Sequence, residues 1–248
     1  MRISIITVSY NSADTIKDTL QCVSGQQYNN IEHIIVDGNS TDLTATIIGG
    51  FNHVHTFISE PDAGLYDAMN KGLRLASGDI IGILNSDDVY ADNQVLDRVV
   101  AAFNDTGTDC VYGDLQYVQT NNLDKVVRTW KAGKFIRENF LYGWMPPHPT
   151  FFVRKEVYDK VGFFNTELKS AADYEIMLRI LYMHGYKASY IPSVLVKMRS
   201  GGISNASLRN RFRANREDAK AWRLINKRPH FFTVYLKPLR KIPQYLIK

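Results

Sequence analysis

The first ninety residues alternate between short apolar runs of strand length and segments whose apolar residues recur at helical spacing. We expect strands at residues 3–9, 31–36, 55–59 and 80–84. Helices are expected between the first and second strands, after the polar turn at residues 37–42, and just before the fourth strand. Such alternation is typical of a parallel sheet with helices on both faces. The predicted fold class is therefore α/β, with a Rossmann-like, mostly parallel sheet flanked by helices.

The second half of the chain is less regular. Strands are expected at residues 110–118 and 150–153, and a helix at residues 174–184. Between them, the three prolines in residues 144–149 indicate a loop, because proline is excluded from helix interiors.

Composition excludes several classes of protein. The chain has 248 residues, 45% hydrophobic and 22% charged, so it is neither disordered, nor collagen-like, nor a coiled coil. Cys22 and Cys110 are too few for a disulfide framework or a four-ligand zinc site, and we expect both to be buried free thiols. No apolar run has the length of about 18–20 residues that a membrane-spanning helix needs, and the N-terminal segment does not resemble a signal peptide. The expected localisation is cytoplasmic.

Charge is divided unevenly along the chain. Residues 1–196 contain 16 Lys and Arg against 23 Asp and Glu, whereas residues 197–248 contain 14 against 2. Apolar residues recur at helical spacing in this basic tail: Leu208, Phe212, Ala219 and Trp222. Basic residues mixed with Trp, Phe and Tyr favour a basic amphipathic helix that binds an anionic membrane surface. RNA binding and a helix simply packed on the domain are the alternatives.

Polar residues follow three of the expected strands. They are Tyr10-Asn11 after the first, Asp37 after the second and Asp87-Asp88 after the fourth. Each alone is an ordinary turn, but parallel strands end at one edge of a sheet, where ligands bind. The adjacent carboxylates repel each other, and Mg²⁺ or Mn²⁺ would relieve this while completing its shell with substrate phosphates. Gly-rich phosphate loops are absent from the sequence.

Four segments in order resemble the family 2 glycosyltransferases of the GT-A fold. They are residues 3–11 (ISIITVSYN), 34–42 (IIVDGNSTD), 70–78 (NKGLRLASG) and 84–88 (LNSDD). The resemblance implies an inverting, metal-dependent hexosyltransferase that uses a nucleotide sugar, with a UDP-sugar as the expected donor. It also implies Mn²⁺ or Mg²⁺ as the cofactor.

The resemblance also implies how the chain is organised. Residues 1–204 are expected to form the GT-A domain, with 1–100 as the nucleotide-sugar-binding half and 101–204 as the acceptor-binding half. Residues 205–248 are then a basic, aromatic-rich C-terminal tail.

Donor and metal ligands are carried over by position. The residues expected to bind the donor are Thr7, Ser9, Tyr10, Asp37, Asp67, Asn70, Lys71, Asp87 and Arg199. Asp37 would accept hydrogen bonds from the base, and Asp87 and Asp88 would hold the metal. Two positions depart from the family pattern: Asn85 stands where many members have Asp, and Met69 where many have Arg. Which of the two carboxylates binds the metal directly is therefore left open.

An inverting transfer needs one base, which takes the proton of the acceptor hydroxyl as it attacks the sugar. The matching segment is residues 170–175 (SAADYE), and Asp173 is the expected base, although Ala172 replaces the usual Glu. The alternative is an Asp that only complements the helix dipole. His148 and Glu175 are candidate acceptor-side residues, each with a structural alternative. Arg199 is expected in a flexible loop that closes over the diphosphate.

The predicted function is therefore sugar transfer to a glycan or lipid-linked acceptor in bacterial polysaccharide biosynthesis. The tail would hold the enzyme on the inner face of the plasma membrane, and no nucleic-acid partner is expected. A sugar-nucleotide or nucleotidyl-transfer enzyme is one alternative, although its usual Gly-rich, basic N-terminal loop is missing. An inactive nucleotide-binding membrane adaptor is another, and the retained Asp173 argues against it.

Overall fold

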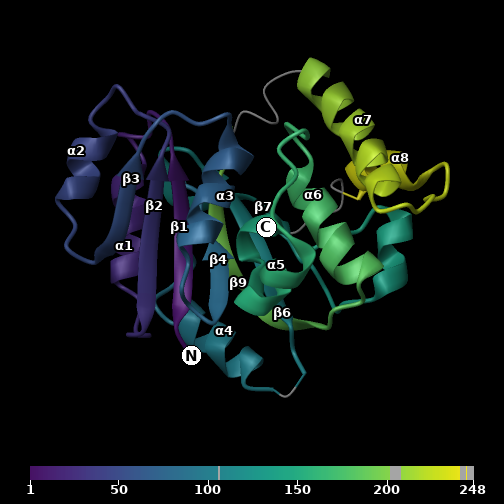
Figure 1. Cartoon of the computed structure of the whole chain (residues 1–248), viewed down its shortest axis with the longest axis horizontal. Helices are drawn as coiled ribbons and strands as arrows, with labels where there is room; N and C mark the ends of the chain where they lie inside the picture. Colours follow the sequence, from purple (N-terminus) through teal and green to yellow (C-terminus); the bar gives the residue numbers. More distant parts are fainter. Residues whose placement is uncertain (106, 202–207, 241–243, 245–248) are drawn as a thin grey trace.

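The computed structural model describes residues 1–105, 107–201, 208–240 and 244 (Figure 1). The expected domain boundary between residues 204 and 205, and Tyr245 of the tail, lie outside the described residues. Within the described part of the chain, one sheet contains the strands β1 (Ile3–Ser9), β2 (Ile31–Asp37), β3 (Val54–Ser59), β4 (Ile80–Ile83), β5 (Asp88–Tyr90), β6 (Cys110–Gln119), β7 (Asn122–Trp130), β8 (Phe152–Arg154) and β9 (Ala188–Arg199).

The sheet is parallel in its first half and mixed in its second. The strand order is β3-β2-β1-β4-β8-β6-β9-β5, with β7 paired to β6. The first four strands in this order, β3, β2, β1 and β4, are mutually parallel. After them β8 runs antiparallel to β4 and β6, and β5 runs antiparallel to β9. The parallel half is the part that the alternating pattern of the first ninety residues predicted.

Helices cover both faces of the sheet (Figure 1). The α-helices are α1 (Ile16–Ser24), α2 (Thr44–Gly49), α3 (Leu65–Leu75), α4 (Val95–Phe103), α5 (Lys155–Val161), α6 (Ala172–Met177), α7 (Leu208–Leu224) and α8 (Thr233–Leu239). Short 3₁₀ segments, η1 and η2, span Arg137–Tyr142 and His148–Thr150, and a π-helical segment, η3 (Leu178–Met183), continues α6. No helix among the described residues is long and apolar enough to cross a membrane.

The two-residue period of β1 sends its side chains to two separate cores. Ile6 and Val8 pack with α3, α5 and α6, whereas Ile3 and Ile5 pack with α1 and α4. Helix α3 lies so close to β1 that a Cβ on Gly72 would come within 2.4 Å of Ile6 Cγ2. Only glycine fits there, and this contact fixes the helix that carries several candidate site residues.

The basic tail packs on the domain. Trp222 of α7 is fully buried, its ring lies edge-on to Tyr182, and its Nε1 donates a hydrogen bond to Tyr174 Oη at 3.0 Å. The ammonium of Lys237 in α8 pairs with Asp218 at 2.7 Å and lies 3.8 Å from the centre of the Tyr174 ring. Of the three interpretations of the tail, a helix packed on the domain is thus realised by the described residues of α7 and α8.

The structure contains most of the strands and helices that the sequence predicted. Both cysteines have free thiols. Cys110 is buried, but Cys22 is only half-buried, so the expectation of two buried thiols is half right. The sequence patterns missed the helices α4 and α5 and the strands β5, β7 and β9. Strand β9 is only partly buried along most of its length and contains Pro192, so it lacks the apolar run that identified the others.

Candidate active site

The ends of β1, β2 and β3 lie side by side at one edge of the sheet. In the strand register Ser9 stands opposite Asp37, and Asp37 stands opposite Ser59. Tyr10 follows directly after β1, and its side chain is 64% exposed. The parallel arrangement therefore gathers the expected strand-end residues along one edge, as a ligand site in an open sheet requires.

Asp37 is buried and surrounded by donors. Its carboxylate accepts hydrogen bonds from Ser9 Oγ at 2.9 Å, Ser59 Oγ at 2.7 Å, and both the backbone NH and the hydroxyl of Ser40 at 2.8 and 2.5 Å. Burial alone would raise the pKa of Asp37, but the hydrogen bonds from Ser40, Ser59 and Ser9 outweigh it, so the pKa lies below its usual range. These four bonds occupy the four acceptor sites of a carboxylate. A nucleotide base can therefore form a hydrogen bond to Asp37 only by displacing one of the serine donors.

The two adjacent carboxylates differ sharply in environment. Asp88 is fully buried in β5, while Asp87 is half-buried in the turn before it. Burial raises the pKa of Asp88 well above its usual range, and the charge of Asp87 raises it further. Burial also raises the pKa of Asp87. Of the two, only Asp87 has substantial access to a ligand at the sheet edge.

Unpartnered oxygens surround this pair. Asp88 accepts one hydrogen bond from Asn85 Nδ2 at 3.2 Å, but Asp88 Oδ1 and Asn85 Oδ1 have no partner among the described residues. No cluster of three or more His, Cys, Asp or Glu in the described part of the chain could hold a metal by itself. One or two carboxylates completed by substrate phosphates are, however, the usual ligands of Mg²⁺. The residues present fit a divalent cation held in that way.

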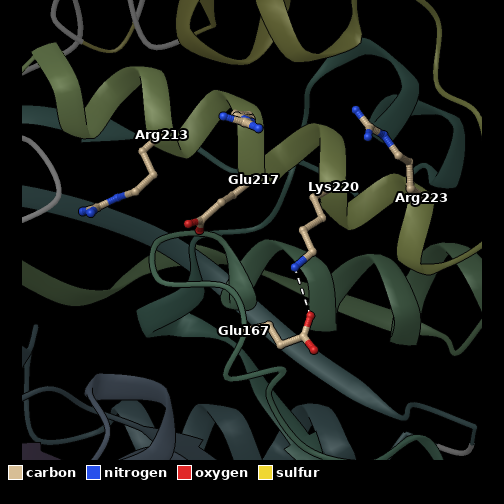
Figure 2. A pocket seen from close by; sticks show the side chains of 6 residues that line it. Glu167, Arg213, Glu217, Lys220 and Arg223 are labelled. Atoms are coloured by element: carbon tan, nitrogen blue, oxygen red, sulfur yellow. Dashed lines mark hydrogen bonds and ion pairs between the residues drawn. The ribbon is translucent and has the colours of Figure 1, made fainter.

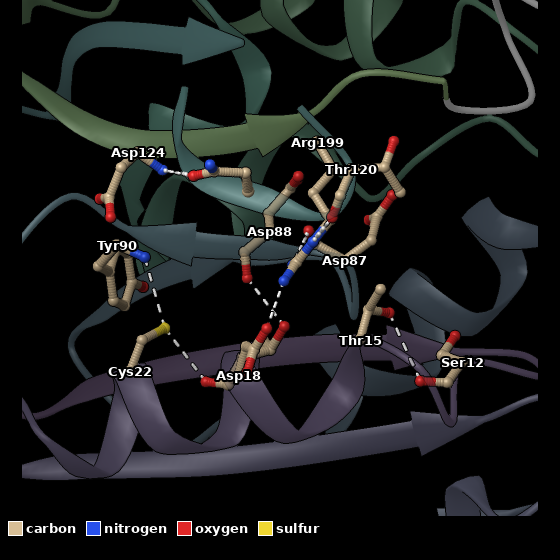
Figure 3. A network of polar contacts seen from close by, with 12 residues as sticks. Ser12, Thr15, Asp18, Cys22, Asp87, Asp88, Tyr90, Thr120, Asp124 and Arg199 are labelled. Atoms are coloured by element: carbon tan, nitrogen blue, oxygen red, sulfur yellow. Dashed lines mark hydrogen bonds and ion pairs between the residues drawn. The ribbon is translucent and has the colours of Figure 1, made fainter. Parts of the chain in front are cut away.

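Arg199 is not the loop cation that was expected. It ends β9 and is only 5% exposed. Its guanidinium donates to the Asp87 carbonyl at 2.7 Å and to the Thr120 carbonyl at 3.0 Å, and it forms an ion pair with Asp18 of α1 (Figure 3). These contacts commit the side chain to holding the backbone of the Asp87 turn, so it is not free to close over a diphosphate.

Asp173 lies half-buried in the first turn of α6. Its Oδ1 accepts a hydrogen bond from Tyr66 Oη of α3 at 3.2 Å. Burial and the charge of Asp173 raise the pKa of Tyr66, so the phenol keeps its proton and acts as a donor. Burial lowers the pKa of His148, and the nearby Asp173 carboxylate opposes that shift. The arrangement presents a carboxylate oriented by a phenol, with a largely uncharged imidazole close by.

Phe164 links the members of this group. Its ring stacks on Tyr66 at 5.6 Å and meets the His148 ring edge-on at 5.8 Å. Asn70 holds the Phe164 backbone with both ends of its amide, accepting from the NH and donating to the carbonyl at 2.9 Å each. Asn70 is 4% exposed, so its amide supports the Phe164 backbone and is not offered to a donor as expected.

Two further expected site residues have structural partners. Thr7 is fully buried, and its hydroxyl bonds to His33 Nε2 at 3.0 Å, so it does not reach the sheet edge. Glu175 is 4% exposed and forms a two-pronged ion pair with Arg179 at 2.7 and 2.9 Å, which makes it structural.

Lys71 and Asp67 remain near the sheet edge on α3. The Lys71 ammonium pairs with Glu60 at 2.7 Å and with the Pro61 carbonyl at 2.9 Å. Asp67 accepts a hydrogen bond from the backbone NH of Ala63 at 3.1 Å and is half-buried. Both therefore help to shape the acidic loop at residues 60–64.

Sequence reasoning missed Tyr66 and Asp18 as members of the site. Tyr66 contacts a residue 107 positions away, and Asp18 contacts one 181 positions away. No local spacing or motif carries such pairings. The only available signal was that Tyr66 falls in the expected helix beside Asp67.

Comparison with known proteins identifies the chain's relatives. The profile described as Glycosyl transferase family 2 matches residues 4–162. An uncharacterized glycosyltransferase of Mycobacterium tuberculosis is 32% identical over 186 residues, covering 71% of this chain and 68% of the relative. A PGL/p-HBAD biosynthesis glycosyltransferase of Mycobacterium bovis is 30% identical over 222 residues, covering 84% and 81%.

Solved structures share the architecture. Residues 1–349 of Staphylococcus aureus TarS, in complex with UDP-GlcNAc, superpose with a TM-score of 0.71 at 20% identity. The match covers 91% of this chain and 65% of those TarS residues. The mannosyltransferase PcManGT of Pyrobaculum calidifontis, in complex with GDP-Man and Mn²⁺, superposes with a TM-score of 0.67 at 22% identity, covering 97% and 69%. These likenesses confirm the expected GT-A fold.

Proposed function

The chain belongs to glycosyl transferase family 2 and is a glycosyltransferase of glycan biosynthesis, and from that premise we propose that it transfers a sugar from a nucleotide diphosphate sugar to an acceptor hydroxyl with inversion. Tyr10 is exposed beside the buried Asp37, so its ring is available to stack on the base. The acceptor is a glycan or a lipid-linked glycan. A UDP-sugar is the first donor to test.

Asp173 is the proposed general base. As the acceptor oxygen bonds to the anomeric carbon, the bond from that carbon to the diphosphate breaks, and the acceptor proton passes to the Asp173 carboxylate. Tyr66 donates to Oδ1 and so orients the carboxylate. The observation that carries this proposal is the contrast within α6: Glu175 is buried and paired with Arg179, whereas Asp173 is accessible.

Asp87 is the proposed metal ligand, with Asp88 and Asn85 behind it. The exposure of Asp87 and the burial of Asp88 support this assignment. A bound Mn²⁺ or Mg²⁺ would draw negative charge from the departing diphosphate. Arg199 holds the carbonyl of Asp87 and so keeps its backbone in place.

The base can be tested with Asp173→Asn. We expect transfer to fall about 10²–10⁴-fold, the usual contribution of a general base, while the affinity for the donor stays the same. Asp159→Asn is the matched control, because Asp159 is an exposed carboxylate on α5 whose one ion pair among the described residues is with Lys155. Transfer by Asp173→Asn within about threefold of the wild-type rate, well under that range, would move the role to another residue.

We also propose that the tail attaches the enzyme to an anionic membrane, at the inner face of the plasma membrane. Support comes from apolar side chains that the packed tail leaves outside: Phe231 is 89%, Tyr235 69% and Leu239 55% exposed. Exposed aromatic and basic residues together suit the headgroup region. Sedimentation with phosphatidylglycerol vesicles should show binding that Phe231→Ser/Tyr235→Ser reduces. Equal sedimentation of the variant and the wild type would refute this role.

A further inference from the structure

A hollow of about 370 Å³ lies along α7, beside the loop that carries Glu167, and neither Asp37 nor Asp87 lines it. We propose that it binds phosphate groups of the acceptor substrate; this rests on the proposed function, because it names the chemical class of that acceptor. Only charged side chains line the hollow: Glu167, Arg213, Arg216, Glu217, Lys220 and Arg223 (Figure 2).

The cations of the hollow come from consecutive turns of α7. They recur every three or four residues, a spacing that places side chains on one face of a helix. Lys220 is neutralised by Glu167 of the loop before α6, at 3.0 Å. Arg216 and Arg223 are exposed and have no ion-pair partner among the described residues. The hollow therefore holds an excess of positive charge that is available to a ligand.

The opposite face of α7 anchors the helix that carries these arginines. Ala221 and Trp222 are fully buried, and Ile225 is 2% exposed. The cationic face is thus presented by an anchored helix, so its charges are kept in register without a ligand to order them. Such preorganisation reduces the entropy lost when a ligand binds.

The hollow adjoins the proposed base. The Glu217 carboxylate accepts a hydrogen bond from the backbone NH of Ser170 at 2.7 Å, three residues before Asp173. The charge of Glu217 also contributes to raising the pKa of Tyr66, the phenol that bonds to Asp173. A molecule that reaches Asp173 with its hydroxyl can therefore place a neighbouring anionic group in the hollow.

A diphosphate suits the hollow better than a single carboxylate does, because it carries more negative charge and more acceptor oxygens for several donors at once. Arginine presents a planar fork of donors that matches phosphate oxygens, and two such forks can share one diphosphate. The donor's own diphosphate belongs at Asp87 on the sheet edge, so the phosphate in the hollow is assigned to the acceptor. A lipid-linked or polymeric glycan that carries phosphate is the acceptor class that follows.

The test uses full-length protein and citronellyl diphosphate, a soluble alkyl diphosphate, with binding measured calorimetrically. EDTA is present throughout, so that no metal can draw the probe to Asp87. We expect Arg216→Gln/Arg223→Gln to weaken binding at least about tenfold, since it removes two charge-assisted contacts. Arg216→Lys/Arg223→Lys should retain part of the affinity, which shows that a loss in the glutamine variant is not a folding defect.

The matched control is Lys227→Gln/Arg228→Gln, which removes two exposed charges from the same tail outside the hollow. It should bind the probe within twofold of the wild type. Equal weakening in both glutamine variants, or no binding of the probe by the wild type, would overturn the proposal. Phosphatidylglycerol vesicles distinguish the source of phosphate: if Arg216→Gln/Arg223→Gln loses vesicle binding but keeps the probe, the arginines serve the membrane and the proposal is wrong. Hydrolysis of UDP-sugars by the wild type tests the proposed function separately.

Discussion

His33 makes the stability of this protein sensitive to acid. It lies in the middle of β2, fully buried, with Nε2 bonded to Thr7 Oγ1 and Nδ1 bonded to His53 Nε2, at 3.0 Å each. Burial lowers the pKa of His33 from 6.5 to about 3, and the neighbouring His53 and His55 add to the shift. The folded protein therefore keeps His33 neutral at a pH where the unfolded chain protonates it.

The sign and size of the effect follow from linkage. Because the folded pKa is the lower one, the stabilisation is fully present above pH 6.5 and is lost as the pH falls toward 3. At pH 5.0 the pH is 1.5 units below the pKa of His33 in the unfolded chain, so that histidine is protonated there, while the folded histidine is still neutral. At about 1.36 kcal/mol per unit, the loss between pH 7.5 and pH 5.0 is about 2 kcal/mol. The figure holds for any folded pKa well below 5.

Urea unfolding at pH 7.5 and pH 5.0 measures this loss. His33→Gln removes the titration, so its free energy of unfolding should fall by about 2 kcal/mol less than that of the wild type on acidification. We compare the change in unfolding free energy between the two pH values in each protein, so the cost of the substitution itself cancels. The opposite trend from Asp88, whose raised pKa favours the folded state in acid, cancels in the same way. His184→Gln, at an exposed position, should behave as the wild type. The same acid-induced loss in His33→Gln and the wild type would refute the reasoning.

Four other perturbations follow from the contacts described. Arg199→Lys should lower the free energy of urea unfolding by about 1–3 kcal/mol, because buried carbonyls lose donors. It should also raise the Mn²⁺ concentration needed for half-saturation. An unchanged Mn²⁺ titration would mean that Arg199 does not support the Asp87 turn. Trp222→Ala should lower the free energy of unfolding by about 3–5 kcal/mol, the usual penalty for emptying a buried aromatic site. A calorimetric unfolding midpoint equal to that of the wild type would mean that α7 does not pack as described. Asp88→Asn should raise the urea midpoint at pH 7.5, because it removes a buried carboxylate charge. Asp87→Asn should abolish Mn²⁺ binding, which paramagnetic resonance of free Mn²⁺ measures. Retained binding would exclude Asp87 as the ligand.

The parallel half of the sheet was predictable because its strands carry their own signal. Every residue of β1 is buried, and a run of Ile and Val is needed to fill both cores. Strand β9 and helix α5 are partly solvent-exposed, so their apolar periodicity is too weak to identify them.

The candidate site was predictable only as far as local position determines it. Asp37 and Asp87 follow apolar strands, and the end of a parallel strand must lie at the sheet edge. The roles of the other two depend on distant partners. Asn70 bonds to Phe164, 94 residues away, and Arg199 bonds to the Asp87 carbonyl, 112 residues away. Whether an amide or a guanidinium is used for binding or for support is decided by such distant contacts.

The packing of α7 and α8 against Tyr174 bears on the order in which this protein matures. A ribosome releases the strands β1 to β4 first, and they can pair with one another before the rest of the chain exists. Helix α6, by contrast, presents an uncovered Tyr174 until Trp222 and Lys237 have emerged. The nascent chain can thus assemble the parallel half of its sheet early, while the helix that carries Asp173 waits for residues 222 and 237. The surface that carries Asp173 is then completed only after α7 and α8 have left the ribosome.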